Sequence, residues 1–301
     1  YKAPSILARD SVPDVGDAET IWSYEAGVKS ELLDRRLRLN LTGFYFEMSD
    51  QQLPVTGGLT NTIGLFNADA TTGYGFAAFA PAYAVAEPIP GPTTEAFTAV
   101  CAAADAYAVV GLLERAGAET IYNSAALIGP EGVIGTYRKA HLPLLGVDRL
   151  TTPGDTGFRV WETPLGRVGI IICYDLRFPE AMRALALAEA DIVALPTNWP
   201  DGSQNAPQFV TRTRALENRV FVLACNRCGE ESGFWFFGHS QITNPLGEVL
   251  AEAGADEEIC YAEIDPTAAR QKRIVIRPDE FEMDTVGDRR PDLYDKLVEV
   301  K

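Results

Sequence analysis

The sequence predicts a layered α/β domain over most of its 301 residues. Three observations lead to this prediction: short apolar strands alternate with helices, one apolar run is β-branched almost throughout, and turns rich in Gly and Pro separate the segments. Alternation of this kind is typical of sheets covered by helices. The hydrophobic content of 47% supplies enough apolar material for a buried core, and the length suits one large or two ordinary domains.

The first 70 residues have a strand pattern with a period of two. Apolar and polar side chains alternate over residues 20–29 and again from Leu37, on either side of the polar break at residues 34–36. Two such patterns around a polar break predict an antiparallel hairpin. A Gly-rich loop at residues 56–58 follows, and then a shorter predicted strand at residues 62–66.

From residue 70 the chain changes to strands alternating with helices. Residues 92–108 begin with a proline and predict a helix. The run VGIIIC at residues 168–173 predicts a strand that is covered on both faces. The other predicted elements are strands at residues 108–113, 123–129, 191–196 and 220–225, and helices at residues 178–190 and 209–218.

Composition excludes several classes of partner. A net charge of −16 makes nucleic acid and anionic lipid surfaces poor partners. The five cysteines lie in apolar segments, and their odd number leaves one cysteine without a partner in any set of disulfides. This pattern favours reduced thiols in a cytoplasmic protein. The N-terminal residues have no apolar core of signal-peptide length, and no apolar run suggests a membrane-spanning helix.

Cys173 is the first candidate for chemistry. It ends the predicted strand at residues 168–173, and a polar turn that opens a helix follows it. Unpaired backbone N–H groups at such a junction stabilise a thiolate and can receive an oxyanion. The alternative interpretation is a buried structural cysteine, which is a common fate of intracellular thiols.

Lys139 is the second candidate, because a lysine close to a cysteine stabilises both the thiolate and a charged tetrahedral intermediate. Taken alone, a lysine in a loop is usually solvated. His141 lies two residues further on, and histidine is the usual partner of a cysteine nucleophile. The residues by themselves leave these alternatives open.

Ordered blocks around these residues resemble the nitrilase superfamily of carbon–nitrogen hydrolases. The blocks are YRKAHLP, TPGDTGF, GRVGIIICYDLRFPE, ADIVALPTNW, TRALENRVFVLACNR and FGHSQITNPLGEVLAEAG, with TTGYGF upstream and RRPDLY at the end. The resemblance covers about residues 70–301. It implies a four-layer α-β-β-α sandwich, usually paired as a homodimer through a helical face, that works without a cofactor.

The resemblance also implies a Glu-Lys-Cys triad that hydrolyses a nitrile, amide or carbamoyl carbon through a thioester. Carried over to this sequence, Cys173 is the nucleophile and Lys139 is the cation. The backbone N–H of Tyr174 would help to bind the oxyanion. Asn198 and Trp199 would line the pocket.

Supporting roles follow for three more residues. Asp148 takes the place of a second family glutamate and would contact Lys139. Glu217 matches a glutamate near the active lysine, and His141 matches a supporting position. Glu114, Glu180 and His239 are interpreted as surface, supporting or structural groups. The pair Cys225 and Cys228 lacks the further ligands of a zinc site, so we expect no metal there.

The catalytic glutamate of the family has no match. Counting back five residues from Gly73 leads to Ala68, and the nearest carboxylate is that of Asp69. Neighbouring side chains of a strand face opposite sides, so Asp69 is expected to point away from Cys173. Loss of a general base typically costs about 10²–10⁴ in rate.

The N-terminal sequence resembles part of the barrel of TonB-dependent outer-membrane receptors. The matching stretches are ETIWSYEAGVKSELLDRRLRLNLTGFYFEMSDQQL and NADAT. A spanning barrel must close on itself, and three or four strands cannot do this. We therefore expect residues 1–69 to be a receptor-like hairpin that replaces the family's first strand, helix and strand, and residues 70–301 to be the hydrolase domain.

Two hypotheses about function follow. The first is a hydrolase acting on linear amides or N-carbamoyl compounds, with a small molecule as its partner. The second is a catalytically inactive chimera that keeps the hydrolase fold. A receptor fragment is disfavoured, because the chain is acidic and lacks a recognisable signal.

Overall fold

The computed structural model describes residues 37–42, 63–67 and 78–299, with side chains from residue 78 onward. The described strands form two six-stranded sheets and two hairpins. The first sheet has the order β14-β1-β2-β3-β4-β5, with β1 at Leu37–Thr42, β2 at Ile63–Asn67, β3 at Tyr107–Arg115, β4 at Ile121–Gly129, β5 at Gly132–Arg138 and β14 at Ile259–Ile264.

The second sheet has the order β13-β12-β9-β8-β7-β6, and its central strands β7, β8 and β9 run parallel. Its strands are β6 at Val160–Thr163, β7 at Gly166–Ile170, β8 at Ile192–Thr197, β9 at Phe221–Asn226, β12 at Gln241–Thr243 and β13 at Val249–Glu252. Strand β8 is wholly buried, as its apolar run predicts.

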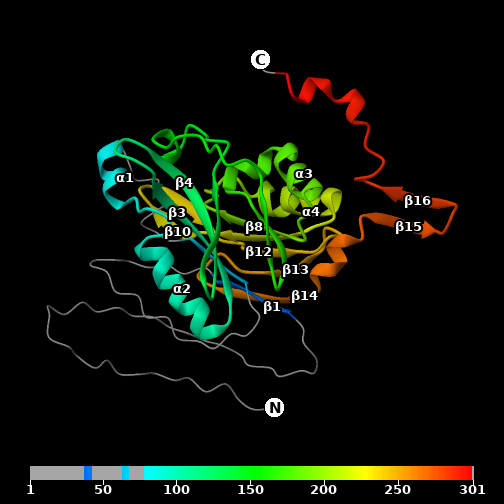
Figure 1. Ribbon diagram of the computed structural model, residues 1–301, viewed down its shortest axis with the longest axis horizontal. Coiled ribbons are helices and arrows are strands. Elements are labelled where there is room, and N and C mark those ends of the chain that lie inside the picture. Colours follow the sequence, from blue (N-terminus) through cyan, green and yellow to red (C-terminus); the bar gives the residue numbers. More distant parts are fainter. Residues whose placement is uncertain (1–36, 43–62, 68–77, 300–301) are drawn as a thin grey trace, which may run out of the picture.

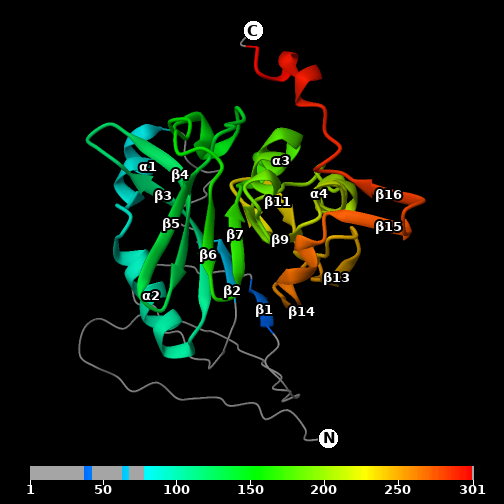
Figure 2. The ribbon, with the colours of Figure 1, turned by 45° about the vertical axis from the view of Figure 1, so that its right-hand side comes forward.

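The two sheets pack face to face, and helices cover their outer faces. The largest apolar cluster joins residues of both sheets, such as Val109 and Leu127 with Ile170 and Leu223. Helix α2 (Pro92–Ala104) packs on the first sheet with α1 (Phe79–Val85) beside it, while α3 (Pro179–Leu187) and α4 (Thr211–Asn218) pack on the second. Figure 2 shows the strands between these two helical sides. The described part of the chain therefore has the predicted order of helix, sheet, sheet and helix.

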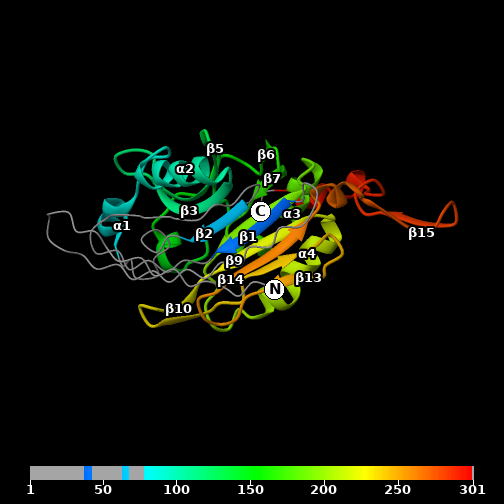
Figure 3. The same ribbon diagram turned by 90° about the horizontal axis from the view of Figure 1, so that it is seen from below.

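Strands β1 and β2 confirm two of the strands expected in the N-terminal region. Strand β1 pairs antiparallel with β14 on one edge and parallel with β2 on the other. Figure 3 shows β1 beside β14. Residues 20–29, the first strand of the predicted hairpin, lie outside the described residues.

Local sequence explains where α2 begins and ends. Pro92 fits the first turn of a helix, and Thr94 Oγ accepts a hydrogen bond of 2.9 Å from the N–H of Gly91. The helix ends at Ala104 because Asp105 adopts a left-handed conformation, with φ of 48°. The predicted helix at residues 92–108 is therefore too long, and β3 takes up its last two residues.

The C-terminal part leaves the body of the molecule. The hairpin of β15 (Arg273–Arg277) and β16 (Phe281–Asp284) projects away from the two sheets, and short 3₁₀ turns at Pro291–Leu293 and Asp295–Leu297 follow (Figure 1). A smaller hairpin of β10 (Cys228–Glu231) and β11 (Phe234–Phe237) flanks the second sheet. Among the described helices, none is long and apolar enough to cross a membrane.

Candidate active site

Cys173 lies just beyond the end of a parallel strand. Strand β7 ends at Ile170, and Cys173 is the first residue of a 3₁₀ turn at Cys173–Arg177. The prediction that the strand continues to Cys173 is therefore wrong, because its φ of 46° is left-handed and incompatible with a strand. Tyr174 is the second residue of this turn, where N–H groups have no acceptor within the turn itself.

Lys139 follows β5 directly and is almost completely buried, with 2% of its surface exposed. Its Nζ donates a hydrogen bond of 2.5 Å to Asp148 Oδ2, and Asn123 Nδ2 donates one of 2.8 Å to the other oxygen, Oδ1. The backbone N–H of Lys139 donates to the carbonyl of Asn123, at 2.8 Å. The lysine is therefore fixed at both its backbone and its ammonium group.

The charges around Lys139 keep it protonated. Burial by itself lowers the pKa of a lysine, but negative charge on Cys173, Asp148 and Asp175 outweighs burial and holds the pKa of Lys139 above its ordinary value. A lysine with a raised pKa cannot take up a proton at neutral pH. It can offer positive charge to an anion that forms beside it.

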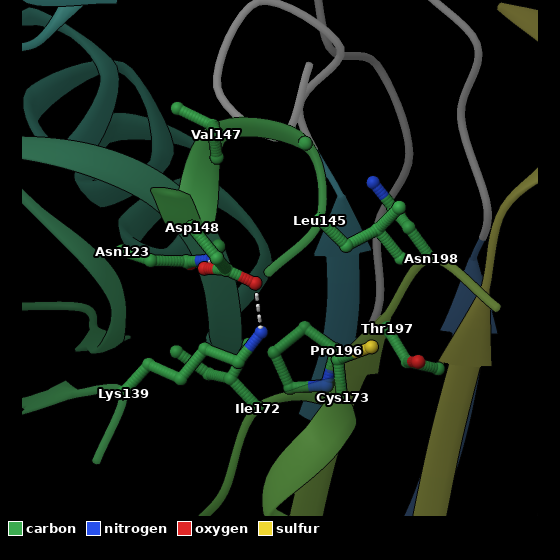
Figure 4. Close-up of a pocket in the computed structure, with 12 residues that line it drawn as sticks. Asn123, Lys139, Leu145, Val147, Asp148, Ile172, Cys173, Pro196, Thr197 and Asn198 are labelled. Carbon is green, nitrogen blue, oxygen red and sulfur yellow. Dashed lines mark hydrogen bonds and ion pairs between the residues drawn. The ribbon is translucent and has the colours of Figure 1, made fainter. Parts of the chain in front are cut away.

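One pocket brings four of the predicted residues together. Figure 4 shows Cys173, Lys139, Asp148 and Asn198 around it, with Pro196 beside the thiol. The described residues that line it are Gly111, Asn123, Lys139, Leu145, Gly146, Val147, Asp148, Ile172, Cys173, Pro196, Thr197 and Asn198. Asp148 is the one carboxylate among these described lining residues.

Four predicted residues lie away from the described lining: His141, Tyr174, Trp199 and Glu217. Trp199 is 4% exposed and packs in the apolar cluster under α3 and α4, and its backbone N–H donates to Asn226 Oδ1 at 2.7 Å. Tyr174 is 37% exposed, and its ring meets that of Phe178 edge-on. Glu217 belongs to α4 and pairs with Arg214 at 2.9 Å. Positions 68 and 69, to which the missing glutamate was assigned, lie outside the described residues.

Asp175 has a place in the site that sequence reasoning missed. It is fully buried and accepts four hydrogen bonds: from Tyr137 Oη at 2.8 Å, from the N–H of Ile172 at 2.9 Å, and from the N–H and Nδ1 of His141 at 3.0 and 2.7 Å. His141 thus contacts this carboxylate. The sequence signal was an acid two residues after Cys173, which looks like any polar turn residue.

The remaining candidates lie outside the described lining of the pocket. Glu114 is 7% exposed and pairs with Arg138 at 2.5 Å, so it is buried rather than on the surface, whereas Glu180 is exposed. His239 pairs with Glu252 at 2.8 Å. Burial raises the pKa of the Cys101, Cys225 and Cys260 thiols to about 12. No cluster of potential metal ligands occurs within the part of the chain that the structure describes.

The fold is that of the nitrilase superfamily. The chain belongs to the carbon-nitrogen hydrolase family, whose sequence signature matches residues 70–274. A second signature, "TonB dependent receptor-like, beta-barrel", matches residues 1–87. Both predicted resemblances are thereby confirmed, and the two matched ranges overlap at residues 70–87.

Individual relatives agree with this assignment. A nitrilase of Pyrococcus abyssi is 41% identical over 225 residues, which is 74% of this chain and 82% of that protein. The omega-amidase of Homo sapiens is 33% identical, covering 75% of this chain and 81% of its own length. A crystal structure of a carbon-nitrogen hydrolase from Helicobacter pylori superposes with a TM-score of 0.69 at 26% identity, covering 79% of this chain and 86% of that one.

Proposed function

We propose that this protein hydrolyses a carbon–nitrogen bond of a linear amide or N-carbamoyl compound through a thioester on Cys173. The observation that carries the proposal is the shared pocket, in which the thiol lies with a buried, positively charged lysine. Relatives named as nitrilase, omega-amidase and N-carbamoylputrescine amidase support this substrate class. Pairing into a homodimer and a cytoplasmic location stay predictions.

In the first half-reaction the sulfur of Cys173 attacks the carbonyl carbon of the amide. The oxygen gains negative charge, which the Lys139 ammonium and the backbone N–H of Tyr174 would stabilise. The C–N bond breaks when the nitrogen takes up a proton, and that proton comes ultimately from the thiol. The products of this step are the thioester and ammonia or an amine.

In the second half-reaction water attacks the thioester carbon. The C–S bond breaks, the acid is released, and one water proton returns to the sulfur. Both halves need a group that takes a proton and gives it back. The family uses a glutamate for this task, and this sequence has Ala68 at the corresponding position.

One observation favours the second hypothesis, a chain with little or no turnover. Asp148 is the one described carboxylate in the pocket, and its two oxygens already accept hydrogen bonds from Lys139 and Asn123. It is therefore placed to hold the lysine charged rather than to take a proton from the thiol. Under this hypothesis the site is assembled but lacks its base.

The first experiment measures ammonia release from a panel of linear amides and N-carbamoyl amino acids. Turnover by the parent should disappear in Cys173→Ala, with a loss on the order of a millionfold if the nucleophile is correct. Activity that survives this substitution would refute the role of Cys173.

A second experiment separates the two hypotheses. Ala68→Glu should raise turnover by about 10²–10⁴ if position 68 lacks the base. The matched control is Asp69→Asn, which removes the neighbouring carboxylate and should leave turnover unchanged. A folded Ala68→Glu variant with no increase would show that the base is not missing at that position.

A further inference from the structure

We propose that Asp175 is the positioning residue that holds Lys139 against Cys173, an inference that rests on the proposed function of these two residues. The carboxylate touches neither the ammonium nor the thiol in a hydrogen bond. It acts through the two backbone segments that carry them. These segments are separated in sequence and meet only through tertiary packing.

The two carboxylate oxygens of Asp175 bind different donors, and together these donors come from both segments. Oδ1 accepts from the N–H and Nδ1 of His141, at 3.0 and 2.7 Å. Oδ2 accepts from Tyr137 Oη at 2.8 Å and from the N–H of Ile172 at 2.9 Å. Tyr137 and His141 flank Lys139 on either side, and Ile172 immediately precedes Cys173.

Additional contacts fold the lysine segment around the same carboxylate. Tyr137 Oη accepts a hydrogen bond of 3.2 Å from the N–H of Ala140, which closes residues 137–140 into a compact loop. The ring of His141 stacks on that of Phe178, with centroids 3.6 Å apart. Phe178 follows the turn that Cys173 begins, so the ring contact joins the same two segments a second time.

Only a carboxylate satisfies this arrangement. All four partners present donors, and Asp175 is fully buried, so no bulk water can replace a lost acceptor. An asparagine has one carbonyl oxygen and one amide group, and its amide would face either His141 or Ile172 donor to donor. Asp175 also adds to the negative charge that raises the pKa of Lys139.

Asp191→Asn is the matched control for Asp175→Asn. Asp191 is also fully buried, but it accepts from Arg167 and Arg270 and does not line the described pocket. Both substitutions are isosteric and both remove a buried charge. A purely structural role would therefore affect both variants alike.

The first readout is the rate at which iodoacetamide alkylates Cys173 as pH is varied, which requires no turnover. We expect Asp175→Asn to slow the reaction at neutral pH about tenfold, because Lys139 no longer stands beside the thiol. Asp191→Asn should match the parent. Identical pH profiles for the two folded variants would overturn the proposal.

The second readout is catalytic. For Asp175→Asn we expect kcat to fall about 100-fold with KM little changed, since misplacement of catalytic groups affects the chemical step. If the parent shows no turnover but its Cys173 is alkylated selectively and Asp175→Asn slows this, the positioning role stands and the proposed function fails. If the Cys173 of the parent is no more reactive than its buried thiols, both fail.

Tyr137→Phe provides a milder variant for the case in which Asp175→Asn does not fold. It removes one of the four donors and leaves the charge in place. We expect slower alkylation of Cys173 than in the parent, with a smaller effect than that of Asp175→Asn. A folded Tyr137→Phe protein with the parent's alkylation profile would count against the proposal.

Discussion

The two ends of the parallel strands β7, β8 and β9 differ in the groups that surround their buried carboxylates. The carboxyl ends lead to Cys173 and Asn198 and form one wall of the pocket. The amino ends lie near Asp191, whose N–H donates to the carbonyl of Arg167. Ligand sites in α/β sheets lie outside the carboxyl ends of strands, and this chain follows that rule.

Each end buries one carboxylate completely, with different donors. Asp175 is held by a phenol, two backbone N–H groups and an imidazole, and by no guanidinium group. Asp191 is held by the guanidinium groups of Arg167 and Arg270, at 3.0–3.2 Å. The charge of Asp191 is thus neutralised where it stands, while that of Asp175 is left to act on Lys139.

The lysines of the two ends show the consequence. Carboxylates and Cys173 raise the pKa of Lys139 in spite of its burial. Burial lowers the pKa of Lys272 to about 8, and the attraction of Asp191 is opposed by Arg167, Arg219 and Arg183. The comparison teaches that Lys139, which follows β5 of the first sheet and lies at the pocket, is held charged. Burial instead weakens the charged form of Lys272, near the amino end of β9.

The largest effect on this comparison is expected from Lys139→Met, which removes the charge and keeps most of the side-chain volume. Turnover should fall about 10²–10³-fold, as is typical when a group that stabilises the oxyanion is lost. Lys272→Met is the control and should leave turnover unchanged. Equal activity of the parent and the folded Lys139→Met protein, measured by ammonia release, would remove Lys139 from the mechanism.

A smaller effect, on stability alone, is expected from Asp191→Asn. The substitution leaves two guanidinium groups without their carboxylate and should cost about 1–3 kcal/mol in the free energy of unfolding at neutral pH. Urea titration measures this cost, and turnover should not change. A loss of activity without a loss of stability would contradict the division between the two ends.

The pKa of Asp191 determines how the stabilisation by this carboxylate changes with pH. Burial alone would raise this pKa, but the hydrogen bonds from Arg167 and Arg270 lower it below its ordinary value of 3.8. The stabilisation is therefore present above pH 3.8 and is lost as the pH falls through the lower, folded value. The difference between the parent and Asp191→Asn should accordingly shrink in acid.

The smallest effect is expected on stability at alkaline pH, when Lys272 is replaced by Met. Between its folded pKa of about 8 and its ordinary value of 10.5, the unfolded chain keeps a proton that the folded chain has lost. By linkage, this group makes stability rise with pH across that window. In Lys272→Met the rise should be missing relative to the parent. A steeper rise in the variant, measured by denaturant unfolding in alkaline buffers, would reverse the assigned direction.

Short-range patterns in the sequence determined much of the fold. The β-branched and apolar runs located β3, β4, β8 and β9, because a strand buried on both faces needs apolar side chains throughout. A proline located the start of α2. Element ends were less well predicted. Helix α2 stops early because Asp105 is left-handed, and β7 ends at Ile170, before the left-handed Cys173.

The sequence by itself determined which residues could carry the chemistry. Cys173, Lys139 and Asp148 are candidates because they lie in or near sequence blocks that resemble the family, and a thiol, an ammonium and a carboxylate together are typical of nucleophilic catalysis. Only the tertiary structure decided how they meet. The pairing of β1 with β14 and the burial of Asp175 depend on contacts between residues far apart in the chain, and local patterns carry no record of them. An aspartate in a polar turn looks the same in the sequence whether its carboxylate faces water or joins two loops. Its role depends on burial, which only the tertiary structure shows.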